Sequence, residues 1–121
     1  MNDFTGALGE VLAARYLRAH GYEICSANYR TRMGEIDLVA EKDGVLVFAE
    51  VKTRSDGMIA LPSESVGFEK QRKLVLAASH YLKSVRDASC ITRFDVIEVY
   101  LDAQGEQKEI RHIPNAFDST L

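Results

Sequence analysis

The sequence predicts an α/β fold, in which helices flank a mixed central sheet of about five strands in a two-layer or three-layer sandwich. Three observations support this prediction. Two segments repeat their apolar residues with a helical period, and a turn-forming Asp-Gly pair separates two β-prone runs. The predicted elements follow the order helix, three strands, helix, two strands, which suits helices packed on the faces of one sheet.

The two predicted helices span residues 4–20 and 66–85. Gly21 follows the first helix as a stop signal, and Ser63 or Ser65 precedes the second as a cap. Each helix carries one polar residue on a row of side chains that we expect to be buried. Glu10 shares its row with Ala7, Ala14 and Leu17, and Gln71 shares its row with Leu74, Ala78 and Leu82.

Strands are predicted on both sides of the second helix. They cover residues 22–29, both arms of a hairpin within residues 34–54, residues 92–101 and residues 108–113. Residues 55–65 are expected to form a loop, and residues 115–121 a flexible C-terminal tail. The chain of 121 residues contains no internal repeat, so we expect it to fold as a single domain.

The turn of the hairpin is Asp43-Gly44. An Asp-Gly pair between β-prone flanks favours a two-residue turn, because both turn positions then need a positive φ angle. Lys42 is therefore expected to face Val45 across the turn. Since side chains alternate between the two faces of a sheet, this register also decides which residues of the hairpin project together.

Four charged residues are predicted to project from one face of the hairpin. The register places Asp37 directly opposite Glu50, and Glu35 directly opposite Lys52. The other face is apolar and carries Ile36, Leu38, Ala40, Val47, Ala49 and Val51. Like charges directly opposite each other destabilise a sheet, so the two opposed carboxylates need an explanation.

A divalent metal site explains the opposed carboxylates. Mg²⁺ prefers oxygen ligands and often uses one or two carboxylates together with water and substrate phosphates. Lys52 follows Glu50 on the same face, where its ammonium group can activate water or neutralise charge on a phosphate. The alternatives are a solvated sheet face for Asp37 and Glu50, and a cross-strand ion pair for Glu35 and Lys52.

Composition and charge limit the classes of function. The formal net charge of −3 argues against a protein that coats nucleic acid with its whole surface, although a local basic patch can still bind it. No apolar run approaches the ~20 residues that a membrane-spanning helix needs. The N-terminal segment lacks the pattern of a secretory signal. We therefore expect a cytoplasmic protein without a membrane partner.

The same residues carry a resemblance to known families. Asp37 followed by Glu50-Val51-Lys52 resembles the PD-(D/E)xK motif of restriction-endonuclease-like nucleases, with Ile36 at the place of the proline, which supplies no ligand. The segment GEIDLVA is similar to one in archaeal Holliday-junction resolvases. Nearly the whole chain resembles the bacterial YraN family, through Gly9-Glu10, Tyr16-Leu17, Asn28-Tyr29-Arg30, GEIDLVA, Glu50-Val51-Lys52-Thr53-Arg54, Lys70-Gln71 and Arg93-Phe94-Asp95-Val96.

The resemblance implies a restriction-endonuclease-like fold and a DNA endonuclease that depends on Mg²⁺ or Mn²⁺. Asp37 and Glu50 would be the metal ligands, and Lys52 the catalytic lysine. Glu10 would assist through the outer shell of the metal, and Gln71 would support the site from the second helix. The resolvase-like segment implies branched or flapped DNA as the substrate, and the analogy with resolvases implies a homodimer.

Five basic residues are expected to bind nucleic-acid phosphates beside the site: Arg30, Arg32, Arg54, Lys70 and Lys73. The two lysines fall in the first turns of the second helix, where the helix dipole disfavours cations. A solvated helix face is the alternative for them. Arg93 and Asp95 are expected to form a structural pair rather than a catalytic one.

Other roles stay open on the residues alone. Glu10 can be a buried carboxylate paired with a nearby Arg or Lys, and Gln71 can be a hydrogen-bonding residue at a helix end. The whole chain can also be a non-catalytic module, which uses a nuclease-like fold to bind nucleic acid or a protein partner. The negative net charge and the small number of basic residues favour that second function.

Overall fold

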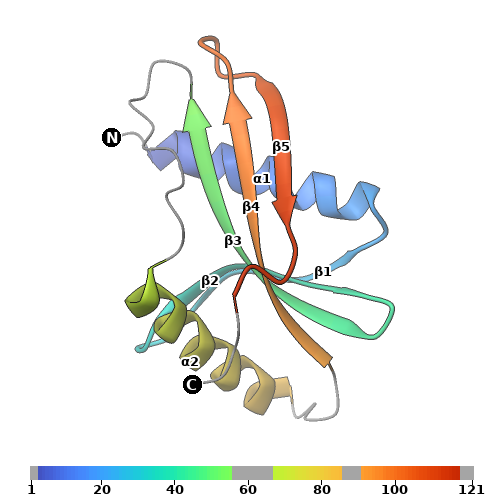
Figure 1. Cartoon of the computed structure of the whole chain (residues 1–121), viewed down its shortest axis with the longest axis vertical. Helices are drawn as coiled ribbons and strands as arrows, with labels where there is room; N and C mark the ends of the chain where they lie inside the picture. Colours follow the sequence, from blue (N-terminus) through green and yellow to red (C-terminus); the bar gives the residue numbers. More distant parts are fainter. Residues whose placement is uncertain (1–2, 56–66, 86–90, 118–121) are drawn as a thin grey trace.

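The computed structural model describes residues 3–55, 67–85 and 91–117. Every predicted helix and strand is present, and the order of the elements is confirmed (Figure 1). The elements are α1 (Asp3–Ala19), β1 (Glu23–Arg30), β2 (Glu35–Lys42), β3 (Val45–Ser55), α2 (Phe68–Val85), β4 (Ile91–Leu101) and β5 (Gln107–Ile113). The predicted loop after Ser55 and the two candidate helix caps lie outside the described residues.

The five strands form one mixed sheet in the chain order β1-β2-β3-β4-β5. The central neighbours β3 and β4 are parallel, and the other neighbouring pairs are antiparallel. Parallel strands cannot be joined by a tight turn, and α2 lies in the connection between these two. The predicted mixed sheet is therefore confirmed.

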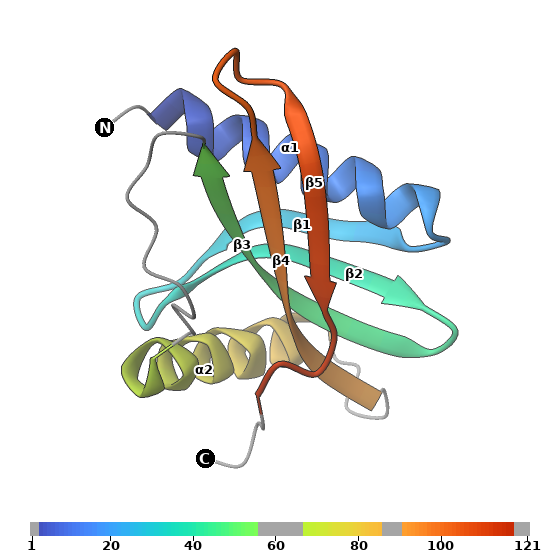
Figure 2. The same ribbon diagram turned by 45° about the horizontal axis from the view of Figure 1, so that its top comes forward.

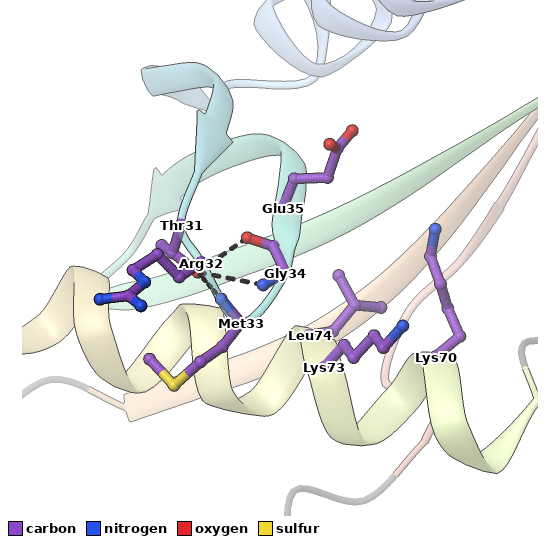
Figure 3. Close-up of a pocket in the computed structure, with 8 residues that line it drawn as sticks. All are labelled: Thr31, Arg32, Met33, Gly34, Glu35, Lys70, Lys73 and Leu74. Carbon is purple, nitrogen blue, oxygen red and sulfur yellow. Dashed lines mark hydrogen bonds between the residues drawn. The ribbon is translucent and has the colours of Figure 1, made fainter.

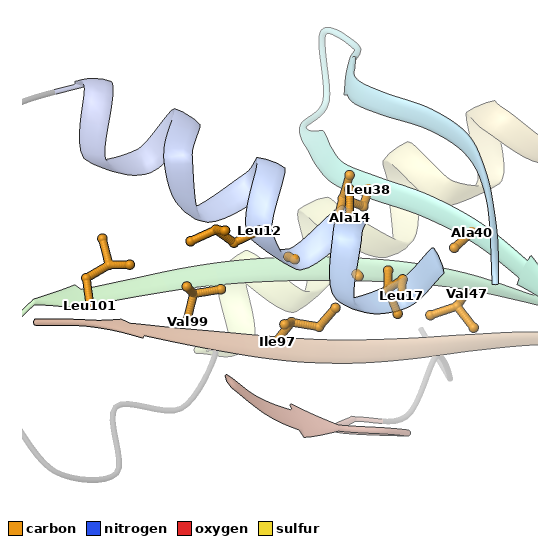
Figure 4. Close-up of a cluster of buried hydrophobic side chains, with 11 residues drawn as sticks. Leu12, Ala14, Leu17, Leu38, Ala40, Val47, Ile97, Val99 and Leu101 are labelled. Atoms are coloured by element: carbon orange, nitrogen blue, oxygen red, sulfur yellow. The ribbon is translucent and has the colours of Figure 1, made fainter. Parts of the chain in front are cut away.

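The two helices cover opposite faces of the sheet, so the fold has three layers (Figure 2). Alternate residues of the central strands face different helices. The buried cluster under α1 contains Leu12, Ala13, Ala14, Leu17, Leu38, Ala40, Val47, Ala49, Ile97, Val99 and Leu101 (Figure 4). The cluster under α2 contains Ile36, Val39, Leu46, Phe48, Leu74, Ala77, Ala78, Phe94 and Val96. Neither of the described helices is long and apolar enough to cross a bilayer.

The turn between β2 and β3 has the predicted form. Asp43 has a φ angle of 52° and Gly44 one of 79°, so both turn residues are in the left-handed region that a type I′ turn requires. Lys42 pairs with Val45, as the two-residue turn predicts.

The hairpin ladder ends sooner than predicted. β2 and β3 pair as far as Leu38 and Ala49 and then separate, because each strand continues along its outer neighbour. Beyond this point Glu35 pairs with Arg30 of β1 and not with Lys52. The predicted opposition of Glu35 and Lys52 is therefore wrong.

The regular alternation of side chains between the two faces of the sheet is also interrupted where β2 and β3 separate. Ile36 packs under α2, whereas Leu38 packs under α1, so the prediction that both share one apolar face is wrong. Asn28 of β1 lies across from Asp37 and has a positive φ angle of 54°. An irregular residue on β1 thus coincides with the point at which β2 turns its side chains over.

A hydrogen-bond network centred on Asp95 connects β4 with Tyr22, with β5 and with the segment after β5. Its side chain is fully buried, at 0% exposure. Nε and Nη2 of Arg93 donate to its two oxygens at 2.8 Å each, Nε2 of His112 donates at 2.7 Å, and the backbone N–H of Asn115 donates at 2.9 Å. Arg93 also donates to the hydroxyl of Tyr22 at 2.8 Å. The predicted pair of Arg93 and Asp95 is confirmed, and it is part of a larger network.

Residues 115–117, at the start of the predicted tail, contact β4. The N–H of Asn115 donates to Asp95, and the N–H of Ala116 donates to the carbonyl of Phe94 at 2.7 Å. The ring of Phe117 stacks on that of Phe94, with the ring centroids 5.1 Å apart. Residues 118–121 of the predicted tail lie outside the described residues.

Candidate metal centre

The candidate site lies where β2 and β3 separate. Asp37 projects from β2, and its Oδ2 accepts a hydrogen bond from the backbone N–H of Val51 at 2.8 Å. The side chain of Asp37 therefore occupies the place of a backbone partner that β3 no longer has. Glu50 of β3 is largely buried, with 13% of its side chain exposed, and its carboxyl group is within hydrogen-bonding reach of Asp37. The predicted meeting of the two carboxyl groups is present, but through their side chains and not as a paired rung of the ladder.

The electrostatics of this pair favour a cation. Burial and then the negative charge of Asp37 raise the pKa of Glu50 from 4.5 to about 7. Burial is also the main cause that raises the pKa of Asp37, against the lowering effect of the Val51 N–H. Two acids this close do not both ionise readily without positive charge between them. A bound cation would remove that obstacle.

Lys70 supplies the nearest positive charge. Its Nζ lies 3.4 Å from Oε2 of Glu50, and it lowers the pKa values of both Glu50 and Asp37. Lys70 stands in the first turn of α2, so its contact with Glu50 joins the helix to the strand. The sequence predicts Lys70 as a nucleic-acid-binding residue and does not reveal this ion pair. The available signal was a lysine in a helical turn where the dipole disfavours it, which therefore needs a partner.

Glu10 approaches Asp37 from α1. Burial is the main cause that raises its pKa, the charge of Asp37 raises it further, and a hydrogen bond from the side chain of Asn28 lowers it. Gly9 permits this close packing, because a Cβ atom there would overlap the hydroxyl oxygen of Thr53 on β3. Side chains of both α1 and α2 therefore approach the place where β2 and β3 separate. The hydrogen bond from Asn28 was not predicted, because the sequence pattern shows only that Asn tolerates a positive φ angle.

Lys52 follows Glu50 by two residues on β3, and Gln71 follows Lys70 in α2. Lys52 is half-buried on β3 and pairs along the backbone with Glu98 of β4. Within residues 6–55, 67–85 and 91–117, its ammonium group makes no ion pair with Asp37 or Glu50. Gln71 is half-buried in α2, and its backbone N–H donates to the carbonyl of Gly67 at 2.9 Å.

Three of the five predicted phosphate-binding residues meet at one pocket. The pocket has a volume of about 360 Å³ and lies between α2 and the connection from β1 to β2 (Figure 3). Its lining residues are Thr31, Arg32, Met33, Gly34, Glu35, Lys70, Lys73 and Leu74. Arg30 lines the neighbouring pocket together with Arg32. Arg54 lies apart, on β3 next to Tyr100 of β4.

The connection from β1 to β2 is held in a compact form. The Thr31 hydroxyl donates to the carbonyl of Gly34 at 2.8 Å and accepts from the N–H groups of Met33 and Gly34 at 3.1 Å each. A Cβ atom on Gly34 would lie only 2.7 Å from the carbonyl oxygen of Lys73. Glycine at this position therefore lets the connection pack directly against α2 and form one wall of the pocket.

The residues present fit a site for Mg²⁺ or Mn²⁺ with few protein ligands. In the part of the chain that the structure describes, no three His, Cys, Asp or Glu side chains converge closely enough to hold a metal ion. The protein ligands of such an ion would be limited to the pair Asp37 and Glu50. Two carboxylates are sufficient for Mg²⁺ when water and substrate phosphates complete its shell. Their burial and raised pKa values mean that a divalent cation would relieve an existing electrostatic cost.

Fold and site together define a three-layer α/β protein whose mixed sheet opens around a pair of buried carboxylates. The profile of "Uncharacterised protein family UPF0102" matches residues 9–99. The chain belongs to this family, which confirms the resemblance to the YraN family.

Similar proteins share nearly the full length of the chain. A UPF0102 protein of Alkaliphilus oremlandii (strain OhILAs) is 46% identical over 119 residues, which cover 97% of this chain and 100% of the relative. A UPF0102 protein of Caldanaerobacter subterraneus subsp. tengcongensis is 45% identical and covers 93% of each chain. One of Clostridioides difficile (strain 630) is 42% identical and covers 96% of this chain and 98% of the relative.

Proposed function

We propose that the protein is a metal-dependent endonuclease that hydrolyses phosphodiester bonds of DNA, on a restriction-endonuclease-like fold. The observation that carries this proposal is the pair Asp37 and Glu50. Both carboxyl groups are largely buried, burial raises the pKa of each and the charge of Asp37 raises that of Glu50 further, and the pair stands beside a pocket lined with basic side chains. A solvated sheet face would have none of these three properties.

The ligands of the metal would be Asp37 and Glu50. The Val51 N–H occupies Oδ2 of Asp37, which orients the carboxylate and leaves its other oxygen for a cation. When bound, Mg²⁺ or Mn²⁺ polarises the phosphorus–oxygen bond and activates water for attack. Glu10 would orient water from the side of α1, because its carboxylate is near Asp37 but belongs to the layer opposite α2.

The cationic residues of the site would bind and orient the substrate. Lys52 projects two residues beyond Glu50 on β3, where its ammonium group would stabilise charge that develops on the phosphate. Gln71 would support the site from α2. Arg30, Arg32, Lys70 and Lys73 would hold neighbouring phosphates, because they line two adjoining pockets. Arg54 would contact a more distant phosphate along β3.

Branched or flapped DNA is the proposed substrate class, and a homodimer the proposed assembly. Both proposals rest on the resemblance of the GEIDLVA segment to Holliday-junction resolvases, which present two active sites to two strands. The localised basic pockets on a chain with a net charge of −3 suit recognition of a particular DNA structure better than coating of long duplexes. The same net charge favours the alternative function, a non-catalytic binding module.

The test compares wild type with Asp37→Asn. An asparagine oxygen can still accept the Val51 N–H, so this variant removes the charge and keeps the hydrogen bond. Both proteins are incubated with labelled linear, flapped and four-way DNA in Mg²⁺ and in Mn²⁺. We expect metal-dependent cleavage by wild type, a loss of at least ~100-fold in Asp37→Asn, and wild-type rates in the matched surface variant Glu109→Gln.

Two results would contradict the proposal. Equal cleavage by wild type and Asp37→Asn would assign the activity to a contaminant or another site. Metal binding in calorimetry without cleavage of any substrate would favour the non-catalytic module. Light scattering that gives a monomer at assay concentration would contradict the homodimer alone.

A further inference from the structure

Lys70 contacts both the carboxylate Glu50 and the basic pocket. Its ammonium group pairs with Glu50 at 3.4 Å, yet half of its side chain, 50%, remains exposed. The same side chain lines the basic pocket with Lys73 and Arg32. Figure 3 shows Lys70 and Lys73 rising from α2 at one end of the pocket, while Arg32 points to the other end. Lys70 is therefore shared between the candidate metal centre and the pocket.

The pocket is built to bind an anion through side chains. The N–H groups of Met33 and Gly34 already donate to Thr31, so they are not available to a ligand. Lys73 and Arg32 remain as cationic donors on two different walls. A volume of about 360 Å³ accepts a phosphate with part of its sugar. Glu35, the acidic residue of the lining, lies on the side toward β2 (Figure 3).

We propose that Lys70 exchanges partners: it neutralises Glu50 while no metal is bound, and it binds a backbone phosphate in the pocket when a divalent cation occupies Asp37 and Glu50. This inference deepens the proposed function and rests on its metal site and its nucleic-acid ligand. It makes Lys70 a positioning residue, which connects metal binding to substrate binding.

The physical basis is competition between two cations for one carboxylate. The ammonium group of Lys70 lies 3.4 Å from Glu50, so it would repel a metal ion bound to the same carboxylate. The four-carbon stem of lysine allows the ammonium group to move without displacement of α2. Once released, Lys70 adds a charge to the end of the pocket that holds Lys73, and an anion there relieves their repulsion. Metal and phosphate therefore strengthen each other's binding, and linkage makes this effect reciprocal.

The experiment separates the two binding events. Mg²⁺ affinity is measured by calorimetry without DNA, and the affinity for a fluorescent, hydrolysis-resistant phosphorothioate oligonucleotide is measured by anisotropy with and without Mg²⁺. For wild type we expect Mg²⁺ to tighten oligonucleotide binding by roughly 5- to 50-fold. In Lys70→Gln we expect Mg²⁺ to bind several-fold more tightly without DNA, because its competitor is gone, and to have little effect on oligonucleotide affinity.

Two further variants act as controls. Lys73→Gln lines the same pocket but has no ion pair with Glu50 among the described residues, so it should weaken oligonucleotide binding equally with and without Mg²⁺. Lys70→Arg keeps the charge and should restore the effect of Mg²⁺.

Unchanged or weaker Mg²⁺ binding in Lys70→Gln, or an undiminished effect of Mg²⁺ on its oligonucleotide affinity, would overturn the inference. So would a wild type that binds no Mg²⁺. If the exchange is observed but no DNA is cleaved, the proposed function fails while the inference stands, so the two failures are distinguishable.

Discussion

Two buried carboxylate sites lie on the neighbouring strands β3 and β4, and their electrostatics are opposite. Asp95 is fully buried, and although burial pushes its pKa upward, hydrogen bonds from His112, Arg93 and the Asn115 N–H together lower it. Glu50 is slightly more exposed, yet burial and the charge of Asp37 raise its pKa to about 7. One carboxylate is stabilised as an anion, and the other is not.

The difference lies in the donors that each site provides. Asp95 receives four hydrogen bonds from groups that are fixed by the fold. Among the described residues, Glu50 has one longer ion pair, at 3.4 Å, with a lysine that is half exposed, and it lies close to a second acid, Asp37. Burial alone therefore does not decide the role of a carboxylate. A buried carboxylate with fixed hydrogen-bond donors stabilises the fold. A buried carboxylate that lacks such donors can instead bind a cation.

The largest expected effect comes from Asp95→Asn. This substitution leaves the Arg93 guanidinium without its buried counter-charge, so we expect the free energy of unfolding to fall by about 3 kcal/mol. Urea denaturation followed by circular dichroism measures the loss. A change below about 1 kcal/mol would mean that the network of Asp95 contributes little to stability.

The next effect concerns pH. Because the folded state holds a proton on Glu50 that the unfolded state releases, stability should fall as pH rises from 4.5 to about 7. Asp95 acts in the opposite direction, since its lowered pKa means that stability is lost as pH falls below 3.8. We expect Glu50→Gln to reduce the decline, of which Asp37 and Glu10 keep a part through their own raised pKa values, and to raise the free energy of unfolding above neutral pH by on the order of 2 kcal/mol. A parallel decline in wild type and variant would exclude Glu50 as its cause.

A smaller effect is expected from Mg²⁺ on wild type above neutral pH. At ten times its dissociation constant, a ligand that binds only the folded state adds about 1.4 kcal/mol to the free energy of unfolding. Thermal or urea denaturation with and without Mg²⁺ detects this. Asp37→Asn should show no such gain, while Asp95→Asn should retain it. A gain of the same size in Asp37→Asn would place the metal elsewhere.

The smallest effect is expected from Glu109→Gln. Glu109 and Arg111 form an ion pair with the same 2.8 Å distance and the same sequence spacing as Arg93 and Asp95, but both side chains are at least half exposed. We therefore expect a change below about 0.5 kcal/mol. A loss comparable to that of Asp95→Asn would show that distance, and not burial, determines the contribution of these pairs.

The fold was largely predictable because its signals are local. The type I′ turn at Asp43 and Gly44, the helical periods and the order of the elements all depend on residues close in sequence. The point at which β2 and β3 separate was not predictable, since it depends on which outer strand each one follows. As a result, the face of Ile36 and the partner of Glu35 were predicted wrongly.

The candidate site was predictable to the same extent. Asp37 and Glu50 belong to one hairpin, so the turn alone brings them together. The ion pair of Lys70 with Glu50 and the approach of Glu10 depend on how the helices dock. Sequence spacing carries no information on those contacts. The donors His112 and Asn115 of Asp95 were missed for the same reason, because β5 and the segment after it must first return to β4.

The two-residue turn between β2 and β3 also has a consequence for folding kinetics. A tight hairpin forms in about 1–10 μs, whereas the pairing of Val45 with Ile91 must close a loop that contains all of α2. Asp37 and Glu50 are then brought together before Lys70 can neutralise them. We therefore expect their repulsion to be present in the transition state for folding, and Glu50→Gln to accelerate refolding in stopped-flow experiments more than it slows unfolding.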